Sequence, residues 1–135
     1  MLLLDTLVNP KRLVIEEIND RRSEHNVHPL HRMELLDQIA RRHVNYMAER
    51  KTITHFGFKN RARFINKMVG NSYVGENCCK YPSKICNRRV VKNIFDGWMR
   101  SEGHKRNILN PVYTSTGIGY VTKNGCIYIV QIFMG

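Results

Sequence analysis

The chain has 135 residues, a length that fits one globular domain over residues 1–135 and leaves no room for a second core. Apolar residues make up 42% of it, which excludes the composition of a disordered chain. Lys and Arg number 22 against 11 Asp and Glu, a formal net charge of +11. The basic residues are spread along the whole chain, so charge predicts attraction to anionic polymers or surfaces and argues against specific nucleic-acid recognition.

The start of the chain does not have the pattern of an export signal. The apolar run that begins at Met1 has no basic region before it and is cut short by Asp5. No stretch approaches the 18 or more apolar residues of a membrane-spanning helix. From the sequence as given we expect a soluble protein, with peripheral membrane contact at most.

The first half of the chain predicts helices. Asn9 and Pro10 are typical of a helix start, and apolar residues then recur at helical spacing to about residue 25. A second helix is predicted to end near Lys51, with one apolar stripe made by Met33, Leu36, Ile39, Ala40, His43, Tyr46 and Met47. Residues 52–59 indicate a loop, and 62–68 a short helix.

The second half predicts a sheet interrupted by one long helix. Residues 72–79 indicate a strand, and Asn87 caps a helix that we expect to stop near Gly103, before a turn over 108–111. Residues 116–122 and 126–133 are predicted strands, joined at Asn124-Gly125 by a hairpin turn. Helices packed on such strands give an α+β fold, a three-layer α/β/α sandwich with a central antiparallel sheet.

The cysteines number four, which allows three pairings: Cys78, Cys79, Cys86 and Cys126. Neighbouring residues of a strand point to opposite faces, so Cys78 and Cys79 do not share a partner readily. A cysteine zinc site competes but lacks the usual two-residue spacer between ligands. The pattern favours one or two disulfides over a cysteine metal site, and reduced core thiols remain an alternative.

Several separated segments are similar, in order, to the motifs of one family: Ile18-Asn19 with Arg22, His55-Phe56-Gly57-Phe58, Gly75-Glu76-Asn77, the block from Trp98 to Leu109, Gly117-Ile118-Gly119-Tyr120 and Tyr128 to Phe133. The chain thereby resembles the SCP-like, bacterial-type domain of the cysteine-rich secretory, antigen 5 and pathogenesis-related (CAP) superfamily. The resemblance covers about residues 11–135, and its long block from Trp98 to Leu109 is highly specific.

The resemblance implies the same sandwich fold and a cleft in which histidines and acidic groups hold a divalent metal. Carried over by position, the metal ligands are His55, Glu76 and His104, and the expected cofactor is zinc or another divalent cation. Two neutral imidazoles and one carboxylate suit such an ion and leave a coordination position open. Ser101 is a further cleft residue, at a position where animal relatives commonly have a second glutamate.

Other conspicuous side chains have a simpler interpretation. His25, His28 and His31 are assigned no role, and His43 on the apolar stripe of its helix indicates a hydrogen-bonded core histidine. Tyr46, Phe95 and Trp98 occur at helical core spacing and are interpreted as packing residues.

For function, the resemblance implies a secreted or envelope-associated binding module, hence an extracellular or cell-envelope location. Its partner would be a lipid or sterol, an anionic glycan or a protein. The alternative is a metal-assisted hydrolase or protease that uses the same His55, Glu76 and His104 cleft. Ser101 lies three residues before His104 but lacks an evident third orienting group, so we favour binding over catalysis and assign no catalytic residue.

Overall fold

The computed structural model describes residues 9–135, so the expectation about Met1 to Asp5 lies outside the described residues. Its elements follow in the order α2 (Pro10–Glu24), β1 (His31–Arg32), α3 (Glu34–Arg50), α4 (Phe58–Val69), β2 (Val74–Pro82), α5 (Arg88–Met99), α6 (Glu102–Leu109), β3 (Ser115–Lys123) and β4 (Cys126–Met134). None of the described helices is long and apolar enough to cross a membrane.

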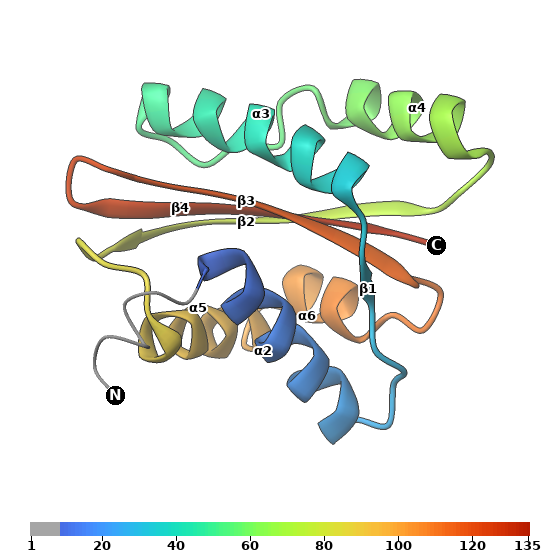
Figure 1. Cartoon of the computed structure of the whole chain (residues 1–135), viewed down its shortest axis with the longest axis horizontal. Coiled ribbons are helices and arrows are strands. Elements are labelled where there is room, and N and C mark those ends of the chain that lie inside the picture. Colours follow the sequence, from blue (N-terminus) through green and yellow to red (C-terminus); the bar gives the residue numbers. More distant parts are fainter. Residues whose placement is uncertain (1–8) are drawn as a thin grey trace.

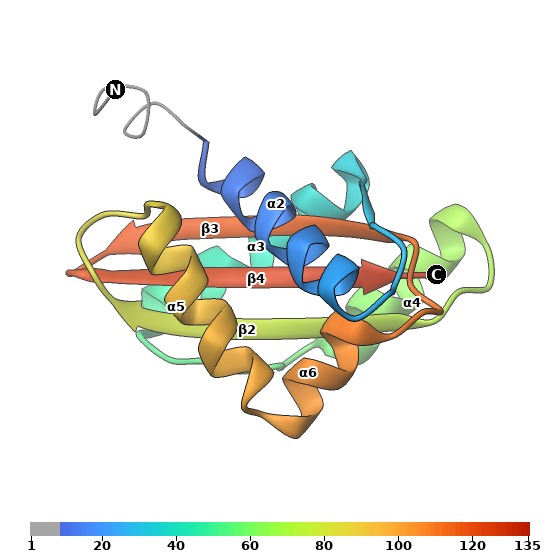
Figure 2. The same cartoon turned by 90° about the horizontal axis from the view of Figure 1, so that it is seen from below.

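The elements form three layers, as the sequence predicts. The sheet has the strand order β1-β3-β4-β2, in which β3 and β2 each pair antiparallel with β4. The short strand β1 pairs parallel with β3. Helices α3 and α4 cover one face of the sheet, and α2, α5 and α6 cover the other (Figure 1). The predicted α/β/α sandwich is therefore confirmed, with β2 along an outer edge of the sheet (Figure 2).

Two predicted boundaries are wrong. The helix predicted from Asn87 to near Gly103 is two helices, because Ser101 adopts an extended backbone (φ −108°, ψ 122°) and starts α6 afresh. The predicted turn at 108–111 therefore begins inside α6. The strand predicted to end at Cys79 continues to Pro82, which pairs with Cys126. An edge strand tolerates proline because one side of its backbone needs no partner strand.

The predicted short helix at 62–68 is also longer than expected. Helix α4 begins at Phe58, directly after a tight turn that the Phe58 N–H closes on the His55 carbonyl at 2.9 Å. The turn shortens the predicted loop and brings His55 close to the start of α4.

Helix α3 lies unusually close to strand β3. A side chain at Gly117 would place its Cβ 2.3 Å from the Leu36 carbonyl carbon and 2.4 Å from the Asp37 nitrogen. Real Cβ atoms do not approach backbone so closely, so only glycine fits. The Asp37 carboxylate adds a hydrogen bond of 2.8 Å from the Ile118 N–H. This contact fixes α3 on the sheet.

A buried arginine holds the opposite layer together. Arg22 of α2 is fully buried, and its guanidinium donates to four backbone carbonyls at 2.7 to 3.2 Å. The acceptors belong to His28, Ile108, Asn110 and Tyr113. These bonds tie α2 to α6 and to the segments that follow each helix, and they satisfy the charge without a carboxylate.

All four cysteines are free thiols, so the prediction of one or two disulfides is wrong. Cys126 pairs with Pro82, four residues along β2 from Cys78, a separation of about 13 Å that no disulfide spans. Cys79 and Cys86 pack against the core on the α5 side. Burial raises the pKa of Cys79 to about 12 and that of Cys86 to about 11, so both are protonated.

Candidate functional site

The edge strand β2 organises the predicted cleft. Alternate residues of a strand point to opposite faces, so Glu76 lies on the α4 side of the sheet and Asn77 on the α6 side. The loop that carries His55 lies beside Glu76, whereas α6, which carries His104, lies on the other face. The cleft residues thus come from both helical layers and meet at one edge of the sheet.

On the α4 side, Glu76 is buried and fully engaged. Arg61 donates to both carboxylate oxygens, with Nε 2.7 Å from Oε2 and Nη2 2.8 Å from Oε1. The Nδ1 atom of His55 lies 2.9 Å from Oε1. Burial raises the pKa of Glu76, but the hydrogen bonds from His55 and Arg61 and the Arg61 charge outweigh it, so the pKa lies below its ordinary value. Glu76 is therefore an ionised carboxylate.

On the other side, side-chain bonds fasten α6 to the unpaired edge of β2. Asn77 donates to the His104 carbonyl at 3.2 Å, and Asn107 donates to the Asn77 side chain at 2.9 Å. A Cβ at Gly75 would lie 2.4 Å from the Tyr113 hydroxyl, so glycine is needed for this close approach. Each residue of the Gly75-Glu76-Asn77 motif thus has its own structural role. Gly75 allows the close approach of Tyr113, Glu76 pairs with Arg61 and His55, and Asn77 bonds to α6.

His104 is held in a fixed orientation at the start of α6. Its Nδ1 lies 2.8 Å from the Ser101 hydroxyl, and its ring stacks on Trp98 with centroids 5.9 Å apart. The Trp98 indole donates to the Cys78 carbonyl of β2 at 3.2 Å. Burial, and next the charge of His55, lower the pKa of His104, so the imidazole is neutral near pH 7. No carboxylate of residues 9–135 bonds this ring, so Ser101 orients the histidine without forming a triad.

The structure brings the predicted ligands together only in part. His55 and Glu76 are in direct contact, while His104 approaches from the far side of β2. A cavity of about 290 Å³ lies at this edge and is lined by His55, Phe58, Val74, Gly75, Glu76, Asn107 and Tyr113. Both carboxylate oxygens of Glu76 already accept hydrogen bonds from Arg61 or lie against His55. The groups that remain to bind a divalent cation are therefore the imidazoles of His55 and His104. Metal binding by His55, Glu76 and His104 stays a prediction.

Sequence reasoning missed a second cluster of ligand types, made by His43, Glu76 and Cys78, whose ligand atoms all lie within 4.8 Å of one another. The Nε2 atom of His43 lies 2.5 Å from the Thr54 carbonyl, and burial lowers the pKa of the ring. Burial also raises the pKa of Cys78. His43 is thus the hydrogen-bonded core histidine that the sequence predicts, and the i, i+2 spacing of Glu76 and Cys78 signals their shared face.

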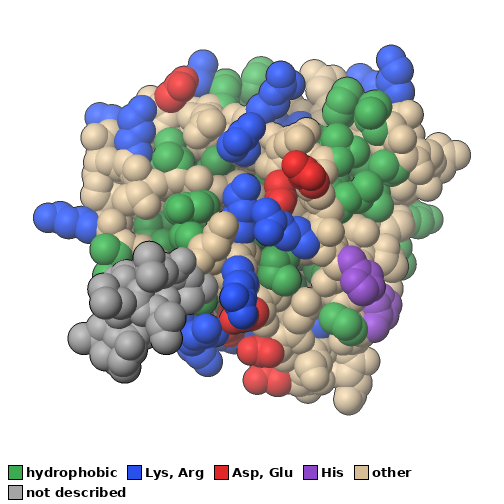
Figure 3. Space-filling view, viewed as in Figure 1, with side chains coloured by type: hydrophobic (Ala, Val, Ile, Leu, Met, Phe, Trp, Pro, Cys, Tyr) green, Lys and Arg blue, Asp and Glu red, His purple; other side chains and the backbone are tan. Residues whose placement is uncertain are grey.

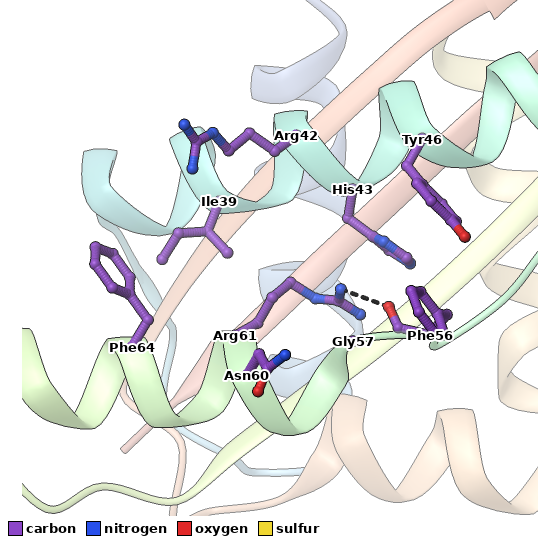
Figure 4. A pocket seen from close by; sticks show the side chains of 9 residues that line it. All are labelled: Ile39, Arg42, His43, Tyr46, Phe56, Gly57, Asn60, Arg61 and Phe64. Carbon is purple, nitrogen blue, oxygen red and sulfur yellow. Dashed lines mark hydrogen bonds between the residues drawn. The ribbon is translucent and has the colours of Figure 1, made fainter.

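A larger hollow, the α3–α4 groove, was also missed. It has a volume of about 450 Å³ and is lined by Ile39, Arg42, His43, Tyr46, Phe56, Gly57, Asn60, Arg61 and Phe64 (Figure 4). Tyr46, interpreted from the sequence as a packing residue, is half-buried and stacks between His43 and Phe56 at centroid distances of 5.9 and 5.8 Å. Phe56 is 69% exposed and Phe64 47%.

The groove and the cleft share one residue. Arg61 lines the groove and pairs with Glu76, and its Nη1 donates to the Phe56 carbonyl at 2.8 Å, the dashed bond of Figure 4. The groove wall and the histidine loop are therefore fixed by the same side chain.

The sequence model of the cysteine-rich secretory protein family, CAP, matches residues 15–133. This chain belongs to the CAP family. The match begins within α2 and ends within β4, and it includes both sides of the cleft. The family assignment made from motifs is therefore confirmed.

The relatives of this CAP domain include a longer protein and a protein of similar length. The uncharacterized protein YkwD of Bacillus subtilis is 33% identical over 128 residues, which are 93% of this chain and 47% of that protein. This chain thus spans about half the length of that relative. An outer surface protein from Borrelia burgdorferi has the same fold, with a TM-score of 0.77, 20% identity and coverage of 94% and 95% of the two chains. NaASP2, whose structure was solved with Zn²⁺, has a TM-score of 0.70, 11% identity and coverage of 96% and 81%.

Proposed function

We propose that this CAP domain is an extracellular binding module whose α3–α4 groove holds the apolar part of an anionic lipid. The observation that carries the proposal is the groove itself, which is open to solvent and lined mainly by apolar and aromatic side chains. Its volume of about 450 Å³ falls in the range of small-molecule sites. An extracellular location is supported by the secretory family and by the outer-surface relative.

The charges at the groove favour an anionic headgroup. Arg61 is committed to Glu76, so its charge is already balanced. Arg42 lines the groove from α3, is exposed, and has no carboxylate within 4 Å among the described residues. A carboxylate or phosphate at the groove mouth would therefore meet the Arg42 guanidinium while its chain contacts Ile39, Tyr46 and Phe64.

A C16 fatty acid is the simplest probe, measured by calorimetry or by displacement of a fluorescent fatty acid. Ile39→Phe should fill the groove and lower the affinity about tenfold or more, since burial of two or more CH₂ groups is lost. Arg42→Glu should also weaken binding, whereas Arg41→Glu, on the same helix but outside the groove, is the matched control. Binding that Ile39→Phe leaves unchanged would contradict the proposal, as would preference for an anionic glycan or a protein.

We infer a second capacity, for a zinc-like cation, at His55 and His104. Each ring has its Nδ1 occupied, by Glu76 and by Ser101, and neither Nε2 makes a hydrogen bond within residues 9–135. In zinc sites such partners orient the imidazole and leave the other nitrogen for the metal. Glu76 and Ser101 would then be orienting residues, and NaASP2, a protein of the same fold, has been solved with Zn²⁺.

The cation proposal is tested by zinc calorimetry at pH 7.5. Wild type should bind, and a His55→Ala, His104→Ala double variant should not. Trp98 is the single tryptophan and stacks on His104, so a change in its fluorescence on adding zinc would report binding at that ring. An absence of heat with wild type would overturn the cation site and leave the groove proposal untouched. It would also remove the basis for metal-assisted hydrolysis.

A further inference from the structure

We propose that helix α4 docks this domain on an anionic membrane surface with its outer face and its C-terminal end. The docking residues are Lys59, Arg63 and Lys67 along the outer face and Met68 and Val69 at the end of the helix, and we call these five the α4 docking face. The inference rests on the proposed lipid-binding function, because the α3–α4 groove opens beside this face. None of the five residues lines the groove, so the two proposals can fail separately.

The charge of α4 is entirely of one sign. From Phe58 to Val69 the helix has four basic residues and no acidic one. Arg61 turns inward to Glu76, whereas Lys59, Arg63 and Lys67 are exposed and have no carboxylate within 4 Å in the described chain. Three unbalanced cations on three turns of one helix give a local positive field, which attracts anionic lipid headgroups.

The same helix exposes apolar side chains that the core does not use. Ile65 is its one fully buried residue, while Phe64 is 47% exposed, Met68 57% and Val69 38%. Residues 64 and 68 are one turn apart and therefore adjacent on the helix surface. Tyr73, in the segment that follows α4, is 72% exposed. A helix in water gains nothing from this exposure, but one that lies in a membrane interface buries it.

The position of α4 leaves this face accessible. The helix lies in the outer layer beside α3, with the sheet on its other side (Figure 1). In the space-filling view, hydrophobic side chains gather over the α4 end of this layer, with Lys and Arg side chains at the outline (Figure 3). A bilayer against this end would meet both kinds of side chain and the exposed Arg42, at the mouth of the groove.

The combination favours a membrane over an anionic polymer. A nucleic acid or an anionic glycan would interact with the three basic residues only, and the affinity of such binding falls steeply as the salt concentration rises. A bilayer also takes up Met68 and Val69, so part of the affinity persists when charges are screened. Salt dependence and the effect of the apolar residues therefore separate the two kinds of partner.

The test is co-sedimentation of the full chain with phosphatidylcholine vesicles that contain no anionic lipid or about one third phosphatidylglycerol. We expect binding to the anionic vesicles only. Lys59→Glu, Arg63→Glu, Lys67→Glu should reduce it about 100-fold or more, given the contribution of each basic residue near such a surface. Met68→Ser, Val69→Ser should reduce it about tenfold from lost apolar burial.

Two matched control variants test whether the loss of vesicle binding is specific to α4. Lys84→Glu, Lys105→Glu, Lys123→Glu makes the same charge change at exposed sites away from α4, and Ile85→Ser removes an apolar side chain that is 63% exposed. Both should bind vesicles far better than the matching α4 variants. Equal losses of vesicle binding in the two charge variants would overturn the proposed docking by α4. Unchanged vesicle binding by Met68→Ser, Val69→Ser would also overturn it. Ile39→Phe should still dock, which distinguishes failure of docking from failure of the groove.

Discussion

Helices α5 and α4, which lie in opposite layers of this CAP domain, bury their side chains to different degrees. Helix α5 buries five residues against the sheet, and the α2 side is closed further by the carbonyl-bound Arg22. Helix α4, of the same length, buries only Ile65 and leaves a groove of about 450 Å³ between itself and α3. The layer of α2, α5 and α6 is therefore closed, whereas the layer of α3 and α4 is open at the groove, although α3 buries eight residues. Substitutions of core residues and of groove residues should therefore have different effects.

Arg22 and Arg61 differ in the same way. Arg22 donates to backbone carbonyls and connects elements of the core, whereas Arg61 neutralises Glu76 between the groove and the cleft. A guanidinium bound by carbonyls serves the fold alone. A guanidinium paired with a carboxylate that also holds His55 serves the site as well.

The largest expected effect is on the closed layer. Arg22→Leu should lower the free energy of unfolding by about 4 kcal/mol, because four buried carbonyls lose their donor at about 1 kcal/mol or more each. Urea denaturation monitored by circular dichroism gives the value. Arg12→Leu, at an exposed residue of the same helix, should change it by less than about 0.5 kcal/mol. Similar losses in both variants would refute the role of Arg22.

Next in size is the contact between α3 and the sheet. Gly117→Ala should cost about 2 kcal/mol, because its Cβ meets the Leu36 and Asp37 backbone and α3 must shift. The matched control is Gly97→Ala in α5, where an added Cβ meets nothing within 4 Å. There the better helix propensity of alanine should stabilise the protein by about 0.5 kcal/mol. Thermal unfolding of the two variants should shift in opposite directions.

A smaller effect concerns pH. Burial lowers the pKa of His43, so the unfolded chain takes up a proton first as the pH falls through about 6.5. His43 should therefore contribute a drop in stability of about 1 kcal/mol between pH 7.5 and 5.5, to which the lowered pKa of His104 adds, and His43→Gln should reduce this slope. The lowered pKa of Glu76 gives stability that is lost only below about pH 4.5, so it does not contribute in this window. A slope that His43→Gln leaves unchanged in urea denaturation would exclude this histidine as its source.

The smallest effect on stability is expected for a residue that lines the groove. Phe64→Ser should change the free energy of unfolding by less than about 1 kcal/mol, because the side chain is 47% exposed. It should nevertheless weaken binding of a fatty acid, since Phe64 lines the groove. Ile65→Ser, one residue further and fully buried, should instead unfold much of the protein by placing a hydroxyl in the core. Equal stability of the two variants would contradict the contrast between groove and core.

The sequence predicted the layers because its apolar residues recur at helical spacing in α3 and α5 and because Asn124-Gly125 marks the hairpin. The break at Ser101 was missed, since residues 100–107 contain no apolar side chain and therefore no periodicity that would mark where one helix ends and the next begins. Family motifs located His55, Glu76 and His104, but no sequence pattern indicates that Arg61 forms an ion pair with the Glu76 carboxylate. The groove escaped prediction because Phe56 lies in a loop, where no periodicity indicates burial, and Phe64 directly precedes the buried Ile65. Only tertiary contacts distinguish such exposed aromatic residues from core residues.

The most direct test of the central claim, that the open layer is the binding surface, is fatty-acid calorimetry on wild type and on Ile39→Phe. We expect wild type to bind the fatty acid, Ile39→Phe to lose affinity about tenfold or more, and Arg41→Glu to keep its affinity unchanged. Wild type that binds no fatty acid, or binds one equally well with the groove filled, would contradict it.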